Sequence, residues 1–186
     1  MAGIVFKVGF PDQKGRFRKL ETAVKYAVVG GLNDGGRKVF TKIRQHLREQ
    51  TKPKRYATVT SRTGSRAAVM GAARFEMFAK NEAIDLAEFG ARLTGRGVEA
   101  APWGQSRVFQ RSFQDRKKVS ERNMEGFVAR LGGKRYPIRA LHGPNLAREF
   151  MGLTRGSRIP QVFATYAQIE VPKAILARLD KALGSS

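Results

Sequence analysis

The sequence predicts an α+β fold in which a long N-terminal amphipathic helix packs on an antiparallel sheet and a second helix closes the chain. Three observations lead to this prediction. Apolar residues recur every three or four positions from Phe17 to Leu47, segments of residues 73–140 alternate in polarity with a period of two, and helical spacing returns after Pro160. Strands and helices that occupy separate stretches of a chain are typical of the α+β class.

The chain is expected to form one domain. It has 186 residues, of which 41% are hydrophobic, enough to build a sizeable core. The expected parts are an N-terminal strand or arm (1–15), a helical segment with a basic loop (16–72), antiparallel strands (73–140), and a connector with the C-terminal helix (141–186). The sequence holds no cysteine, which excludes disulfides, thiolate metal sites and a thiol nucleophile.

The N-terminal region is predicted to form an edge strand and then the long helix. Residues 3–10 alternate strictly in polarity, and Pro11 ends the pattern. The helix that follows contains four glycines within residues 30–36, each of which costs about 1 kcal/mol against alanine in a helix interior. One helix could therefore end and another begin at 33–35. Because the apolar pattern resumes nearly in phase at Val39, we predict one continuous helix.

A short helix near Pro53 and an exposed basic loop are expected to lead into the sheet. The predicted strands cover residues 74–79, 83–91, 97–103, 106–113, 126–131 and 135–140. Gly132 and Gly133 fit a two-residue hairpin loop, and residues 115–123 a charged loop. In the last part we expect a short helix at 145–151, and Pro172 is expected to bend or split the C-terminal helix.

Charge is the most informative property of the sequence. Thirty-six Lys and Arg against 15 Asp and Glu give a formal net charge of +21, which favours an anionic partner. Eleven of the cations lie within residues 37–74, where Glu49 is the single acid. Such a segment can meet DNA phosphates or the carboxylates of a neighbouring subunit, and the sequence does not separate the two. The predicted contact residues are Arg37, Lys38, Arg44, Arg48, Lys52, Arg55 and Arg62.

A second basic cluster surrounds Phe109 and Phe113 and consists of Arg107, Arg111, Arg116, Lys117, Lys118 and Arg122. Interleaved aromatic and basic side chains can stack single-stranded bases, whereas phenylalanine at strand spacing is more often part of a core. No motif for reading a base sequence accompanies the cations. Nor does any apolar run approach the roughly 20 residues of a membrane span, so no membrane partner is expected.

No catalytic constellation is visible, and we expect a protein that is not an enzyme, with no cofactor and no metal. The two histidines, His46 and His142, lie in unrelated contexts, and no nucleotide-binding or metal-binding motif occurs. The carboxylates of the predicted sheet stand singly, and folding could still assemble some of them into the site of a metal-dependent nuclease. These carboxylates are Glu76, Glu82, Asp85, Glu88 and Glu99.

Several short stretches resemble a known family. The stretch Arg135, Tyr136, Pro137 and Ile138, between a basic glycine-containing turn and a C-terminal helix, resembles the phage minor tail protein Z family, also described as tail completion proteins. The Leu-Asn pair at 32–33 with the basic residues after it, and the acid-Thr step at 48–51, are similar to that family as well. The sequence departs from the family at 34–36, where small helix formers are expected.

The resemblance implies a structural virion protein without enzymatic activity. Such a protein is made in the host cytoplasm, completes the tail, joins it to the head at the neck, and assembles as a ring of about 6 or 12 copies. The implied partners are further copies, other tail and connector proteins, and double-stranded DNA in the channel. Residues 135–138 would be structural, with Tyr136 and Ile138 in the core. The N-terminal strand, free loops and a detached C-terminal helix are the expected subunit contacts, and a nonspecific nucleic-acid-binding protein is the alternative function.

Overall fold

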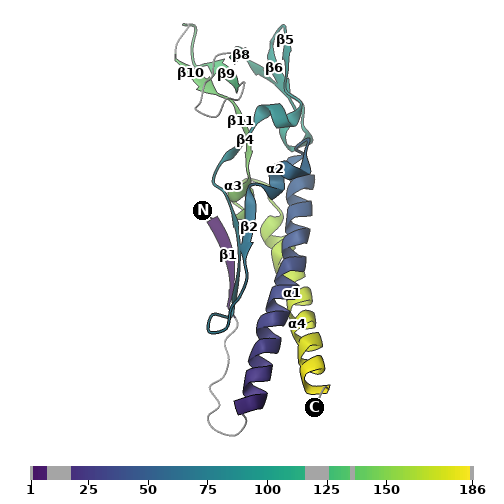
Figure 1. Ribbon diagram of the computed structural model, residues 1–186. Helices are drawn as coiled ribbons and strands as arrows, with labels where there is room; N and C mark the ends of the chain where they lie inside the picture. The colour runs from purple at the N-terminus through teal and green to yellow at the C-terminus, as the bar shows by residue number, and fades with distance from the viewer. Residues whose placement is uncertain (1, 8–17, 116–125, 135–136, 185–186) are drawn as a thin grey trace.

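The computed structural model describes residues 2–7, 18–115, 126–134 and 137–184 and confirms the α+β class. The long helix α1 (Arg18–Thr51) and the C-terminal helix α4 (Ile159–Gly184) form an antiparallel pair along one side of an elongated molecule (Figure 1). Antiparallel sheets of two or three strands make up the rest. The C-terminal helix is therefore not detached, contrary to expectation, because it packs along the long helix.

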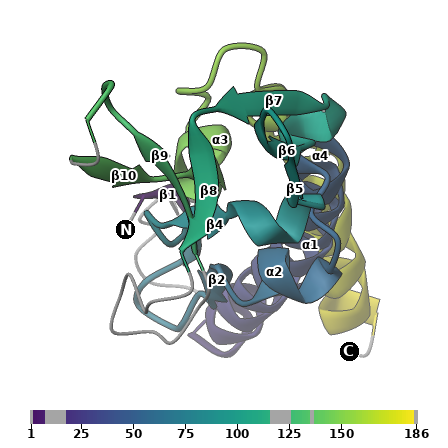
Figure 2. The same ribbon diagram turned by 90° about the horizontal axis from the view of Figure 1, so that it is seen from above.

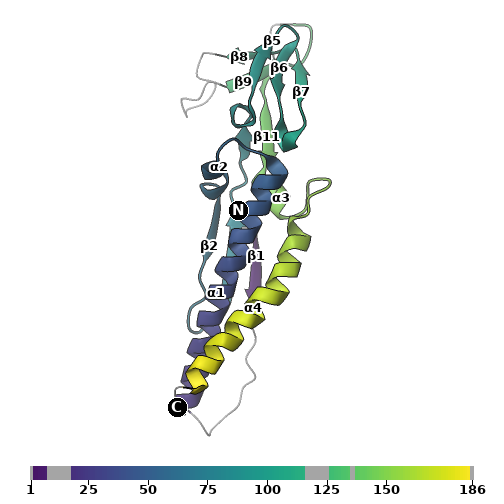
Figure 3. The ribbon, with the colours of Figure 1, turned by 90° about the vertical axis from the view of Figure 1, so that its right-hand side faces the viewer.

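Helix α1 runs without interruption through its glycines, as predicted. Gly31 and Gly35 lie where α1 meets α4, and Figure 3 shows the two helices running side by side. A Cβ atom added to Gly31 would lie 2.4 Å from the Cα of Ile175, and one added to Gly35 would lie 2.7 Å from the Cα of Val171. Only glycine permits the two backbones to approach so closely. The packing against α4 thus offsets the low helix propensity of these residues.

A three-stranded sheet covers another face of α1. Its order is β1 (Ala2–Lys7), β3 (Arg74–Ala79), β2 (Thr63–Arg66), with both pairs antiparallel. A Cβ atom on Gly36 would lie 2.6 Å from the ring of Phe75, so the sheet also uses a glycine of α1 for close packing. The predicted edge strand is confirmed as β1, and residues 8–10 of that prediction lie outside the described residues. Strand β2 occupies part of the segment predicted as an exposed loop.

The hydrophobic core lies where α1, β3, α3 (Leu146–Phe150) and the start of α4 meet. Every third or fourth residue of α1 from Leu32 to Leu47 is fully buried, which is the periodicity seen in the sequence. The fully buried side chains of the core with the largest volumes are Phe75, Phe150, Leu32, Ile43, Leu47, Met77, Ile84, Leu86, Leu146 and Ile159.

The remaining strands form three small antiparallel sheets at the end of the molecule away from the N-terminus of α1, seen from above in Figure 2. The first sheet is β5 (Arg92–Thr94), β6 (Gly97–Ala100) and β7 (Arg107–Gln110). The second is β8 (Ser112–Asp115), β9 (Gly126–Arg130) and β10 (Ile138–Ala140). The third pairs β4 (Ala83–Asp85) with β11 (His142–Asn145).

Several predicted strands are shorter than expected because turns interrupt them. After β4 the carboxylate of Asp85 accepts a hydrogen bond from the backbone N–H of Ala87 at 2.9 Å, which begins the 3-10 helix η1 (Leu86–Phe89). A second 3-10 helix, η2 (Pro102–Gly104), ends the strand predicted at 97–103. The strand predicted at 106–113 breaks at Arg111, whose φ is 58°. Strand β5 was not predicted.

The connection between β9 and β10 also differs from the prediction. Arg130 pairs with Ile138, and the N–H of Leu131 donates to the carbonyl of Pro137 at 3.1 Å, so the loop is longer than the two glycines expected. Ile138 is half-buried and does not belong to the core, which corrects its predicted place. Arg135 and Tyr136 lie outside the described residues, as does most of the predicted charged loop.

The two short helices are confirmed. Helix α2 (Tyr56–Thr60) follows Pro53, and α3 begins where the side chain of Asn145 accepts hydrogen bonds from the N–H groups of Ala147 and Arg148. Helix α4 continues through Pro172, so the expected split does not occur.

Candidate functional site

The C-terminal end of α1 presents a basic groove. The chain leaves the helix at Lys52, which adopts a φ of 56° while its N–H donates to the carbonyl of Arg48 at 2.8 Å. The next residue, Pro53, is buried and turns the chain back, so that α2 lies beside the end of α1. The groove between them has a volume of about 620 Å³ and is lined by Thr41, Gln45, Arg48, Glu49, Lys52, Pro53 and Tyr56.

Five of the seven predicted contact residues are exposed, and four of these, spread from the middle of α1 to the segment that follows it, are called the α1 basic surface: Arg37, Arg48, Lys52 and Arg55. Arg37 and Arg48 are eleven residues apart and therefore share one helix face. The guanidinium of Arg48 lies over the ring of Tyr56, 5.6 Å from its centroid. Among the described residues, Arg37, Arg48 and Lys52 have no carboxylate partner. Their charge is therefore available to an outside anion.

Lys38 lies on the side of α1 that faces α4. Its Nζ is 3.7 Å from a carboxylate oxygen of Glu170, although the Lys38 side chain is 60% exposed. Lys42 lies on the same side, with its Nζ 5.9 Å from the ring centroid of Tyr166. These two lysines thus help to join the helices, and Lys38 is only in part available to a ligand.

Arg44, another of the predicted contact residues, is half-buried and forms hydrogen bonds within the structure. Its Nε donates to Oγ1 of Thr63 at 2.9 Å, and a terminal nitrogen donates to the carbonyl of the same residue at 2.8 Å. The guanidinium also lies over the ring of Phe40, 4.1 Å from its centroid. Burial lowers the pKa of Arg44 from its ordinary value. The side chain joins α1 to β2 and is not free to meet a phosphate.

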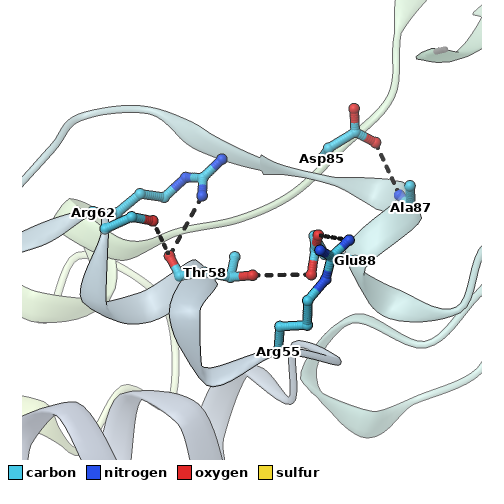
Figure 4. A network of polar contacts seen from close by, with 7 residues as sticks. Arg55, Thr58, Arg62, Asp85, Ala87 and Glu88 are labelled. Atoms are coloured by element: carbon cyan, nitrogen blue, oxygen red, sulfur yellow. Dashed lines mark hydrogen bonds and ion pairs between the residues drawn. The ribbon is translucent and has the colours of Figure 1, made fainter. Parts of the chain in front are cut away.

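Arg62 is likewise half-buried, and it belongs to the network in Figure 4. One of its nitrogens donates to the carbonyl of Thr58 at 3.4 Å. The Thr58 hydroxyl donates to a carboxylate oxygen of Glu88 at 2.9 Å, and the other carboxylate oxygen lies 3.4 Å from Arg55. The network ties α2 to η1. Arg55 keeps 77% of its side chain exposed and remains part of the surface, whereas Arg62 does not.

The carboxylates of the sheet region are held in separate contacts. Glu76 lies between Arg66 and Arg74. Glu99 accepts hydrogen bonds from Ser106 at 2.7 Å and from Arg92 at 2.9 Å, and these two bonds lower its pKa. Among the residues the structure describes, no three His, Cys, Asp or Glu side chains lie close enough together to hold a metal ion.

The second basic cluster is described only in part, because Arg116, Lys117, Lys118 and Arg122 lie outside the described residues. Phe109 is half-buried and packs against the core, which is one of the two alternatives left open by the sequence. Phe113 is also half-buried, with the guanidinium of Arg130 5.1 Å from its ring centroid.

A buried carboxylate that sequence reasoning missed stabilises the junction near the groove. Glu149 of α3 is fully buried and accepts hydrogen bonds from Nε2 of Gln50 and from Nε1 of Trp103, the latter at 2.8 Å. The other side-chain atom of Gln50 accepts from the N–H of Arg158 at 3.1 Å. Gln50 belongs to the acid-Thr step, and its position there is thus explained by packing. No local pattern in the sequence marks Glu149, since its partners come from distant segments.

Comparisons of the chain with protein-family models, curated proteins and solved structures give no match. None of the described helices combines the length and the apolar character needed to cross a membrane.

Proposed function

We propose that this protein is a structural component of a phage virion that completes the tail and joins it to the head as part of an oligomeric ring. The family resemblance at 32–33, 48–51 and 135–138 supports the proposal. The observation that carries it is the α1 basic surface, where three exposed cations have no carboxylate partner among the described residues. In a ring at the neck this surface faces either the passing DNA or the acidic face of a neighbouring tail or connector protein.

The physical basis of the contact is electrostatic and independent of base sequence. Lysine and arginine side chains that neutralise phosphates release bound counterions, which drives association without reading bases. Arg48 and Lys52 lie at the C-terminal end of α1, where the helix dipole favours positive charge. The dipole therefore partly offsets the repulsion between these two cations, and the carboxylate of Glu49 beside them lies 3.4 Å from His46.

Strand β1 offers a further contact for assembly. It is the outer strand of its sheet and pairs only with β3 among the described strands. Such a strand edge can accept a strand from a neighbouring copy. Where the added strand is not β1 itself, the contact joins two different surfaces and can close into a ring.

The direct test of the proposal is the location of the protein in purified phage particles. The exposed end of α4 at Gly184 provides a place for a C-terminal label that does not enter the core. Electron microscopy is expected to show the label at the head-to-tail junction. Absence of the protein from the particle would overturn the structural role.

The same surface also favours the alternative, a nonspecific nucleic-acid-binding protein that acts outside the particle. That function requires DNA affinity in the free protein, falling by about 0.9 log unit per log unit of salt for each phosphate neutralised. Weak binding by the free protein, with a shallow salt dependence, would exclude this alternative and leave the neck role in place.

A matched pair of variants tests the surface itself. The triple change Arg37→Gln, Arg48→Gln and Lys52→Gln removes the three unpaired cations, and the control Arg96→Gln, Lys134→Gln and Arg139→Gln removes three exposed cations from the small sheets. Both variants have the same net charge. The first is expected to lose infectivity and the second to retain it. Equal loss in both would show that total charge, rather than this surface, is what matters.

A further inference from the structure

Helix α4 has apolar residues on two opposite sides. On one side Val171 and Ala174 are buried against α1. On another side Ile169, Leu176 and Leu183 are 57%, 58% and 50% exposed. An apolar side of a helix normally packs against another part of a protein. Within the described part of the chain, the apolar side with Val171 and Ala174 is covered, and the side with Ile169, Leu176 and Leu183 is not.

The exposed apolar residues are regularly spaced. Ile169, Leu176 and Leu183 are seven residues apart, and Val162 extends the series by one heptad towards the N-terminus. Leu179, three residues after Leu176, is half-buried beside them. Apolar residues at these intervals form the seam through which two helices pair in a coiled coil. These five residues are called the α4 stripe.

The charge of α4 favours a second copy of this chain as the partner that packs on the α4 stripe. The protein carries +21, but α4 holds three cations and two carboxylates, a net charge of +1. Two of these groups are already paired with α1, Arg178 with Asp34 at 2.7 Å and Glu170 with Lys38 at 3.7 Å. Because like charges repel, two copies of a strongly basic protein meet at least cost where local charge is near zero. A nearly neutral apolar stripe also offers nothing to DNA.

The charges that flank the stripe are self-complementary. Lys173 and Asp180 each lie four residues after a stripe residue, so both are on the same side of it, and both are exposed. Neither forms an ion pair with another described residue. In an antiparallel helix pair centred near Leu176, residues at such positions face each other. Lys173 of one copy then lies beside Asp180 of the other, and symmetry repeats the contact.

We propose that two copies of this protein associate through their α4 stripes in an antiparallel pair. A contact between two identical surfaces closes on itself and gives a dimer, not a ring. The inference therefore does not depend on the proposed function, and the molecular mass in solution distinguishes the two assemblies. Raising the salt concentration is expected to strengthen the dimer by screening the net charge, the opposite of its effect on DNA binding.

The test is sedimentation of the full chain over a range of concentrations. The wild type is expected to dimerise, and the variant Ile169→Gln with Leu176→Gln to dimerise at least about a hundredfold more weakly, since each change removes a buried apolar side chain from both copies. The control Leu93→Gln with Val108→Gln alters side chains of similar exposure in β5 and β7 and is expected to dimerise like the wild type. A wild type that stays monomeric, or stripe and control variants that dimerise alike, would overturn the proposal.

A charge swap tests the antiparallel orientation. Lys173→Asp alone and Asp180→Lys alone are each expected to weaken the dimer several-fold, because each places like charges opposite one another. The double variant exchanges the two charges and is expected to restore the wild-type affinity. Single variants that leave the affinity unchanged would contradict the antiparallel pairing, because in a parallel pair these two residues do not face each other.

Discussion

The two ends of the molecule are stabilised in different ways. The stem consists of α1, α4 and the sheet of β1, β3 and β2, and it holds fully buried side chains such as Ile43 and Phe75. The head consists of the three small sheets, whose strands have three to five residues and leave Leu93 and Leu131 more than half exposed. The stem is stabilised by close packing of backbones and buried side chains. Much of the head is stabilised by cross-strand contacts near the surface. Mutations are therefore expected to be most costly in the stem.

The largest effect is expected where α1 and α4 touch. Gly31→Ala places a methyl group 2.4 Å from a backbone atom of α4, which cannot move aside without parting the helices. We expect a loss of about 3 kcal/mol in the free energy of unfolding, measured by urea denaturation. The control is Gly30→Ala, whose methyl group would lie 3.5 Å from the flexible guanidinium of Arg178. That variant is expected to gain up to about 1 kcal/mol from helix propensity. Similar losses in both would mean that the helices do not approach as described.

Within the stem, replacing the half-buried Arg44 is expected to cost more stability than replacing the exposed Arg48. Replacement of Arg44 by Gln removes the bonds to Thr63 and leaves its buried hydroxyl without this donor, at a cost of about 2 kcal/mol. Replacement of Arg48 by Gln is expected to change the unfolding free energy by less than about 0.5 kcal/mol, since the side chain is exposed. The stabilities of the two single variants are compared by thermal unfolding. Equal stability would mean that the bonds of Arg44 to Thr63 do not stabilise the fold.

Glu149 tests the junction between stem and head. Glu149→Gln turns an amide N–H₂ towards one of two donors, Gln50 or Trp103, and is expected to cost about 1.5 kcal/mol. The double variant with Gln50→Glu exchanges carboxylate and amide and restores a complete set of partners. Denaturation of the single and double variants is expected to show recovery in the double. If the double variant is as unstable as the sum of the two singles, the network is not as described.

The smallest effect is expected in the head, at Glu99. The hydrogen bonds from Ser106 and Arg92 and the charge of Arg92 lower its pKa, so these contacts contribute stability above the ordinary value of 4.5, and that stability is lost as the pH falls through the folded pKa. Glu99→Gln is therefore expected to lower the melting temperature slightly at pH 7 and not at pH values below the folded pKa. Calorimetry of wild type and variant at both pH values measures the difference. A decrease that is the same at both would exclude these contacts as its cause.

Much of the fold could be predicted because, in long segments, the spacing of apolar residues indicates both the type of element and the side that is buried. The long helix, the C-terminal helix and β3 follow from spacing alone, and β3 has the bounds expected of it. The short strands of the head were less predictable. They end where a side chain such as Asp85 caps a turn or where Arg111 takes a positive φ, and neither event changes the apolar pattern nearby.

The candidate site could be predicted only as a set of cations. Arg44 and Arg48 are one helical turn apart and look equivalent in the sequence, yet β2 covers the first and leaves the second exposed. Lys38 forms an ion pair with Glu170 of α4, which is more than a hundred residues away in the chain. A partner at that distance leaves no trace in local spacing.

The α+β class, both long helices, the basic character of the chain and the place where its cations are concentrated could all be inferred from the amino-acid sequence. The exposure of each cation, the reason for glycines in the middle of a helix and the burial of Glu149 became clear only from the folded structure. The physical reason is that periodicity records the geometry of one segment, whereas burial and pairing depend on what another segment brings to it. The close approach of Gly31 to Ile175 and the bonds from Arg44 to Thr63 exist only after the chain has folded.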